Sequence, residues 1–216
     1  MGIEQDSIKP YWDARAERYT KVGGWGPGAM TPERHRAQVA RRTAFICEPG
    51  WCPKNRVTLD YGCGIGMYAG YFLADKYLGI DIAEPHLAIA IRDNPGYEFK
   101  LIGTPMFEEA STFPQLVNME IFFTATVLQH CSDEVVDGLF ANVAKANSGG
   151  FTFSIYEYAN PDWTSKQTMG RTPAQYVDFA ARHFSIAETK THDHMIHGVL
   201  CAHTMIQTNA IRLGGR

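Results

Sequence analysis

From residue 56 onward, the pattern of hydrophobic and polar positions switches repeatedly between two periods. Short runs of β-branched, aromatic and other apolar residues predict strands at residues 56–60, 77–81, 97–102, 119–125 and 151–156. Apolar residues at helical spacing predict helices at residues 66–74 and 85–92, and a third helix that begins after Ser132 as its N-cap. Strands that alternate with helices in this way favour a parallel sheet of the α/β class.

The C-terminal part of the chain departs from this alternation. Thr172 and Pro173 have the residue types of a helix start and predict a helix that extends to about residue 182. Residues 184–191 and 199–207 then have the pattern of a closing pair of strands. The pattern alone leaves the order of these strands in the sheet open.

Residues 1–50 precede the first strand and are predicted to form a helical extension in front of a domain that spans residues 51–216. Charged residues lie between the aromatic pair at positions 11 and 12 and the aromatic residue at position 19, which is typical of a helix that lies on a protein surface. Residues 23–28 are too rich in glycine for a helix or strand and predict a loop, and residues 31–46 predict a helix that begins at Thr31.

Composition narrows the class of protein. With 216 residues, 45% of them hydrophobic, the chain can form one well-packed α/β domain but not two full ones. A formal charge of −3 argues against a general polyanion binder, and the arginines at positions 34, 36, 41 and 42 are interpreted as a solvated helix face. The five cysteines lack disulfide-framework spacing, and no apolar stretch has transmembrane length. We therefore expect a cytoplasmic protein with reduced thiols and no membrane or nucleic-acid partner.

The most informative stretch is residues 57–66, V-T-L-D-Y-G-C-G-I-G. A buried strand leads into glycines at positions 62, 64 and 66, where the missing side chains let backbone N–H groups approach a ligand closely. The third glycine comes one residue too early for the dinucleotide fingerprint, and Met67 occupies its place. Asp60 precedes the loop, and Asp81 ends the next strand about 20 residues on, where a carboxylate can accept hydrogen bonds from ribose hydroxyls.

In these features the chain resembles the class I (Rossmann-like) S-adenosylmethionine-dependent methyltransferases. The resemblance implies a doubly wound, mostly parallel seven-stranded sheet with a closing antiparallel strand pair and helices on both faces. It implies S-adenosyl-L-methionine as cofactor, S-adenosyl-L-homocysteine as product, and a lid formed by residues 1–50. The cofactor-binding residues that it implies, in the loop, after strands 2 to 4 and in the lid, are Tyr11, Tyr19, Asp60, Gly62, Cys63, Gly64, Gly66, Asp81, Ile82, Thr104, Thr126 and Gln129.

His130 is the candidate catalytic residue, because it follows strand 4 on the ligand side of the sheet. An imidazole can act as a base near pH 7 for a hydroxyl or amine acceptor. The alternative is a structural role at the start of the next helix. The late histidines at positions 192, 194, 197 and 203 lack a convincing set of metal ligands, so a solvated turn is favoured over a metal site.

The segment after strand 5 and the early glycine-rich loop are the candidate acceptor site, because open α/β sheets bind ligands outside the carboxyl ends of their strands. The candidate acceptor-binding residues are Trp25, Glu157, Tyr158 and Trp163. Strand 4 lacks the D/N-P-P-Y/F sequence of enzymes that methylate nucleic-acid amines, which favours transfer to an O or N atom of a small molecule. A non-catalytic S-adenosylmethionine-binding subunit and a nicotinamide-dependent oxidoreductase remain as alternatives, and the sequence does not indicate the oligomeric state.

Overall fold

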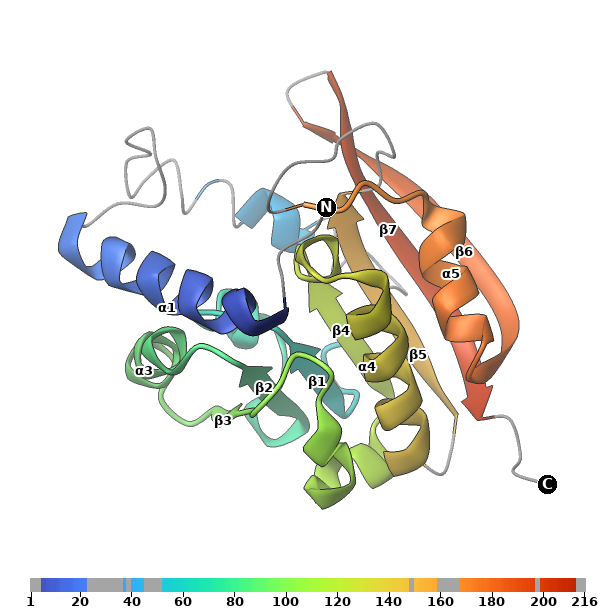
Figure 1. The fold of residues 1–216 in the computed structure, drawn as a ribbon, viewed down its shortest axis with the longest axis horizontal. Coiled ribbons are helices and arrows are strands. Elements are labelled where there is room, and N and C mark those ends of the chain that lie inside the picture. Colours follow the sequence, from blue (N-terminus) through green and yellow to red (C-terminus); the bar gives the residue numbers. More distant parts are fainter. Residues whose placement is uncertain are drawn as a thin grey trace.

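The computed structural model describes residues 5–22, 37, 40–44, 52–147, 150–158, 168–196 and 199–212. Its centre is a sheet in the order β3-β2-β1-β4-β5-β7-β6, with helices packed against it (Figure 1). The first five strands are β1 (Thr58–Tyr61), β2 (Tyr77–Asp81), β3 (Glu98–Leu101), β4 (Ile121–Ala125) and β5 (Gly150–Tyr158). All four pairings among these strands are parallel, which confirms the predicted α/β class with a parallel sheet.

The last two strands extend the sheet beyond β5. They are β6 (Phe184–Ile196) and β7 (Val199–Arg212), and both are longer than their sequence patterns predict. β7 pairs antiparallel with β5 on one side and with β6 on the other. β6 contains two register shifts, between Ile186 and Glu188 and between Asp193 and Met195.

Four helices are described in full: α1 (Gln5–Val22), α3 (Glu84–Asp93), α4 (Asp133–Ala146) and α5 (Pro173–Ala181). The predicted caps of α4 and α5 are confirmed, because Ser132 accepts a hydrogen bond from the Val135 N–H, and Thr172 forms a capping box with Gln175. Residues 37 and 40–44 are helical, while the rest of the helix predicted over residues 31–46 lies outside the described residues. None of the described helices is long and apolar enough to cross a membrane.

The prediction of a helix at residues 66–74 is wrong. Two short 3₁₀ turns, η1 (Ala69–Tyr71) and η2 (Ala74–Lys76), take its place, with the extended residues Phe72 and Leu73 between them. Gly70 and the aromatic residues around it are weak helix formers. The aromatic side chains instead pack against the sheet, where Phe72 stacks on Tyr77 at 5.5 Å between ring centroids.

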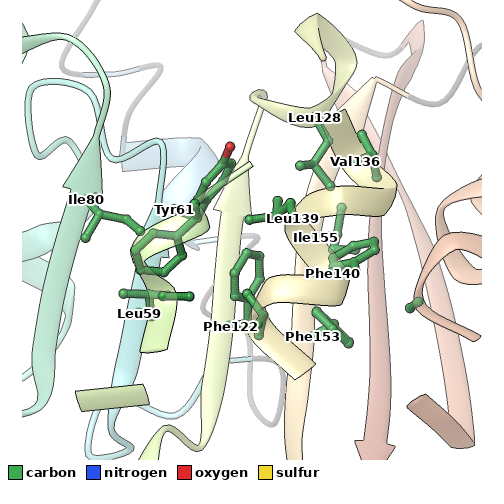
Figure 2. Close-up of a cluster of buried hydrophobic side chains, with 14 of the residues drawn as sticks. Leu59, Tyr61, Ile80, Phe122, Leu128, Val136, Leu139, Phe140, Phe153 and Ile155 are labelled. Atoms are coloured by element: carbon green, nitrogen blue, oxygen red, sulfur yellow. The ribbon is translucent and has the colours of Figure 1, made fainter. Parts of the chain in front are cut away.

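Two hydrophobic clusters cover the two faces of the sheet. The larger lies between the sheet and α1, α4 and α5, and Figure 2 shows the Phe122, Phe140 and Phe153 rings packed where α4 crosses β4 and β5. The smaller contains mainly aromatic residues: Cys52, Tyr68, Ala69, Phe72, Tyr77, Ile121, Phe123 and Tyr156. Together they bury the apolar faces of the strands and leave the carboxyl ends of β1, β2 and β4 side by side at one edge.

Candidate functional site

The glycine loop after β1 is held in a left-handed conformation at three positions. Gly62, Gly64 and Gly66 have φ angles of 70°, 56° and 74°, a region that side chains rarely tolerate. The Gly62 and Cys63 N–H groups both donate to the Ile80 carbonyl at 2.8 and 3.0 Å, which fixes the loop against β2.

The three glycines differ in what surrounds them. A Cβ atom at Gly62 would lie 2.5 Å from Val127 Cγ2, and one at Gly66 would lie 2.7 Å from Asn94 Nδ2. These two glycines therefore permit close packing within the protein. A Cβ atom at Gly64 would meet nothing within 4 Å. Gly64 is thus the loop residue whose surroundings are open to a ligand.

Asp81 lies beside this open position, at the end of β2, and is only 7% exposed. One carboxylate oxygen accepts the Gly64 N–H at 2.8 Å, and the other accepts the Ala83 N–H at 2.8 Å. Burial raises the pKa of Asp81, while the Ala83 N–H, His86 and the Gly64 N–H favour its ionised form. Each carboxylate oxygen retains further acceptor capacity, so the fixed carboxylate can receive hydroxyl groups of a ligand.

Asp60 and Cys63 lie in the interior beneath the loop. The Tyr77 hydroxyl donates to Asp60 Oδ2 at 2.6 Å, and burial raises the pKa of Asp60 to about 7. The Cys63 thiol is buried, with its Sγ 2.9 Å from the place of a Cβ atom on Gly79. The interior contacts of both side chains support the loop from below, in a different place from the open position at Gly64.

Two further residues of the predicted cofactor set lie at the ends of neighbouring strands. Ile82 is buried directly after Asp81. Thr104, in the loop after β3, has a buried hydroxyl with no hydrogen-bond partner among the residues that the structure describes. An unsatisfied buried hydroxyl is costly, and a ligand that reached it would relieve that cost.

A strained turn follows β4. Thr126 has a φ angle of 60°, which is an outlier for a β-branched residue and the kind of strain that concentrates at functional sites. Its N–H donates to the Tyr156 carbonyl at 2.7 Å. Residues Leu128–His130 then form a 3₁₀ turn, in which Gln129 Nε2 lies 3.2 Å from His130 Nε2. We call residues 126–131 the β4 turn.

Glu157 differs from the sequence expectation of an acceptor ligand. Its side chain is 0% exposed, and its carboxylate accepts the backbone N–H groups of Val127, Leu128 and Gln129 at 2.9, 2.9 and 3.2 Å. Burial raises the pKa of Glu157 to about 7, against the effect of these donors and of Arg171. The acceptor role predicted for Glu157 is therefore corrected, because the carboxylate is enclosed and already binds the β4 turn.

Arg171, which sequence reasoning missed, binds the same turn from its carbonyl side and is 2% exposed. It donates to the Leu128 and Cys131 carbonyls at 2.8 and 2.7 Å. It also donates to Asp133 Oδ1 at 2.6 Å. The sequence pattern carries no local signal for these contacts, because they join positions about 40 residues apart.

Helix α1 brings an aromatic side chain to the β4 turn, but it is not one of the predicted tyrosines. The Trp12 ring lies between two imidazoles, 5.0 Å from His130 and 6.1 Å from His86, measured between ring centroids. Tyr11 accepts a hydrogen bond from Arg15 at 3.0 Å and packs edge-on against Trp12. Figure 1 shows α1 lying beside α3 and reaching toward the end of β4. Trp12 and His86 are thus site residues that the sequence pattern does not indicate.

Several predicted residues lie outside the described part of the structure. They are Trp25, Trp163 and His197, together with the side chains of Tyr19, Tyr158, His192, His194 and His203. Within the described residues, no group of three or more histidine, cysteine, aspartate or glutamate residues could hold a metal ion.

Comparison with solved structures shows the same fold in S-adenosylmethionine-dependent methyltransferases. Magnesium protoporphyrin IX methyltransferase from Synechocystis PCC 6803 with bound SAH has a TM-score of 0.61 at 16% identity, over 97% of this chain and 100% of that chain. Phosphoethanolamine N-methyltransferase 1 from Haemonchus contortus has a TM-score of 0.68 at 15% identity, over 98% of this chain and 50% of that chain.

The fold also supports another reaction. The [4+2]-cyclase SpnF has a TM-score of 0.65 at 14% identity, over 100% of this chain and 98% of that chain. No family model and no curated protein matches the sequence. The likeness at these identities is one of fold, so the reaction has to be argued from the site.

Proposed function

We propose that the protein is an S-adenosylmethionine-dependent methyltransferase that acts on an O or N atom of a small molecule. The observation that carries this proposal is the open position at Gly64 beside the fixed carboxylate of Asp81. A glycine loop that leaves room for a ligand close to its backbone, next to an acidic residue, fits the amino-acid and ribose parts of an adenosyl cofactor. The methyltransferase neighbour with bound SAH and the antiparallel β7 inserted between β5 and β6 support the same proposal.

In this proposal each element of the site has a role. Gly64 gives the cofactor its close approach to the loop, and Asp81 accepts the ribose hydroxyls. Thr104 offers its unsatisfied hydroxyl to the adenine, and Ile82 provides an apolar contact. Gly62, Asp60 and Cys63 maintain the loop from within rather than touching the ligand.

The reaction asks little of the protein beyond alignment and exclusion of water. S-adenosylmethionine, when bound, supplies a methyl group that is already activated by its sulfonium. Gln129 and His130 lie on the β4 turn at the same edge of the sheet, and Trp12 covers His130. We propose that the His130 imidazole accepts a proton from the acceptor where the acceptor must lose one, and that α1 shields this side of the site.

The Asp81 carboxylate offers a direct test. Asp81→Ala removes charge-assisted hydrogen bonds to the ribose, so it is expected to weaken S-adenosylhomocysteine binding more than about tenfold, or about 1.4 kcal/mol. Asp75→Ala, on an exposed residue of η2, is the matched control and is expected to bind as the native protein does. Native affinity in a folded Asp81→Ala protein, measured by calorimetry, would refute the ribose assignment.

Turnover separates an enzyme from a non-catalytic binding subunit, and a variant of His130 tests the proposed base. In a screen of hydroxyl- and amine-bearing small molecules with S-adenosylmethionine, we expect formation of S-adenosylhomocysteine that depends on the acceptor. His130→Ala is expected to retain cofactor affinity and lose turnover. Equal turnover in both proteins would refute the base and leave His130 a structural role beside Trp12.

A further inference from the structure

The backbone of the β4 turn is satisfied on both of its polar sides by buried charged residues. Glu157, at the end of β5, accepts the N–H groups of Val127, Leu128 and Gln129. Arg171, just before α5, donates to the carbonyls of Leu128 and Cys131. Two charges of opposite sign thus hold one short turn from opposite directions.

Further backbone groups of the turn also have partners. The His130 N–H donates to the Val127 carbonyl at 2.9 Å, and the Cys131 N–H donates to the Leu128 carbonyl at 3.0 Å. The Gln129 carbonyl accepts the Met169 N–H at 2.6 Å. A turn in which all six N–H groups and the carbonyls of Val127, Leu128, Gln129 and Cys131 are paired in this way has one strongly preferred conformation.

The turn is fixed to the glycine loop as well. The Val127 side chain lies so close to Gly62 that a Cβ atom there would be 2.5 Å from Val127 Cγ2. A shift of the turn would therefore disturb the loop. The same contact means that the position of Gln129 and His130 is defined relative to the open position at Gly64.

We propose that Glu157 and Arg171 are positioning residues that together hold the β4 turn, so that Gln129 and His130 are presented to the reacting atoms at a fixed place. The proposal rests on the proposed function for what Gln129 and His130 do there. The new part is that two residues outside the cofactor and acceptor sites fix the conformation of the β4 turn. Met169 and Arg171 also attach the end of the predicted acceptor-binding segment to the turn, which couples the two sides of the site.

The chemistry of the two side chains suggests the variants. In Glu157→Gln the amide oxygen can still accept two N–H groups, but the amide nitrogen then faces the Gln129 N–H, donor against donor. In Arg171→Lys the charge remains but the planar fork that reaches two carbonyls and Asp133 is lost.

Arg182 is a matched control for Arg171. Both guanidinium groups lie over the Phe179 ring, at 5.6 Å for Arg171 and 4.7 Å for Arg182, and both bind an aspartate. Arg182 is exposed, and its side chain contacts Asp137 and this ring rather than the β4 turn. Arg182→Lys therefore repeats the chemical change without touching the turn.

The experiment is native-state hydrogen exchange resolved by residue, together with the NMR signals of the His130 imidazole, on the full chain without cofactor. Glu157→Gln and Arg171→Lys are each expected to accelerate exchange of the amides of residues 127–131 by about tenfold or more, with β1 and residues 137–146 of α4 unchanged. Both are also expected to shift the His130 signals, and Arg182→Lys should do neither.

Unchanged exchange in residues 127–131 in both variants would overturn the proposal. So would uniform acceleration throughout the core, because it would mean that the two residues contribute only global stability. If Glu157→Gln fails to fold, Arg171→Lys decides on the same criteria. These measurements need no cofactor, so failure of the native protein to bind S-adenosylhomocysteine would refute the proposed function separately.

Discussion

The two roles assigned to the loop glycines, close packing at Gly62 and an open position at Gly64, can be separated by the same substitution at three positions. Gly62→Ala, Gly64→Ala and Gly96→Ala each place a methyl group on a residue with positive φ. That conformation costs an L-residue roughly 1–2 kcal/mol at each site. Gly96 precedes β3, and a Cβ atom there meets nothing within 4 Å, so Gly96→Ala is the control for Gly64→Ala.

The atoms around each new Cβ then determine how the three variants differ in unfolding free energy. At Gly62 the new Cβ would be 2.5 and 2.7 Å from the two Cγ atoms of Val127, which adds an overpacking cost of roughly 1–3 kcal/mol. Gly62→Ala should therefore lose about 2–5 kcal/mol of unfolding free energy. Gly64→Ala and Gly96→Ala should each lose only about 1–2 kcal/mol and remain folded.

Ligand affinity should distinguish the two variants that have similar stability, Gly64→Ala and Gly96→Ala. The methyl group of Gly64→Ala would occupy the space that the cofactor is proposed to enter, so S-adenosylhomocysteine affinity should fall more than about tenfold. Gly96→Ala should bind with native affinity. Urea unfolding gives the stabilities, and calorimetric titration gives the affinities. Equal affinity in Gly64→Ala and Gly96→Ala would refute the argument that the cofactor approaches the open position at Gly64.

Three further predictions concern the interior and α1. The unfolded chain releases the Asp60 proton near pH 3.8, while in the folded protein burial raises the pKa to about 7, so stability should fall as pH rises between these values. Asp60→Asn should reduce that fall in unfolding free energy by up to about 1.4 kcal/mol per pH unit, as measured by urea unfolding. If the unfolding free energy changed with pH equally in both proteins, Asp60 would not be a buried carboxyl with a raised pKa. Trp12→Ala should shift the NMR signals of the His130 imidazole, whereas unshifted signals would mean that α1 does not contact the β4 turn. Phe153→Ala should cost about 3–5 kcal/mol of unfolding free energy, and a loss below about 1 kcal/mol would place the ring outside the core.

The elements that local chemistry determines could be predicted from the sequence. The glycine loop follows from alternating glycines after an apolar strand, and the starts of α4 and α5 follow from Ser132 and Thr172 as caps. Helical spacing gave a wrong prediction at residues 66–74. There the aromatic side chains gain more from packing on the sheet than Gly70 and its neighbours gain from a helix.

The parts of the site that could not be predicted depend on contacts between distant segments. Arg171 reaches the Leu128 carbonyl across 43 positions, and Glu157 reaches the Val127 N–H across 30. In the sequence, Glu157 is one acidic residue in a polar segment, and only the fold shows that it is enclosed. Trp12 reaches His130 because α1 lies at the carboxyl edge of the sheet, and a pattern within α1 carries no information on what the helix packs against.

The central claim is the class of cofactor, and calorimetric titration of the native protein with S-adenosylmethionine, S-adenosylhomocysteine and NADH tests it most directly. The account predicts that the two adenosyl ligands bind and that NADH does not. This result would support an adenosyl ligand at the open position beside Gly64 and the Asp81 carboxylate. Binding of NADH alone, or of none of the three, would contradict the account.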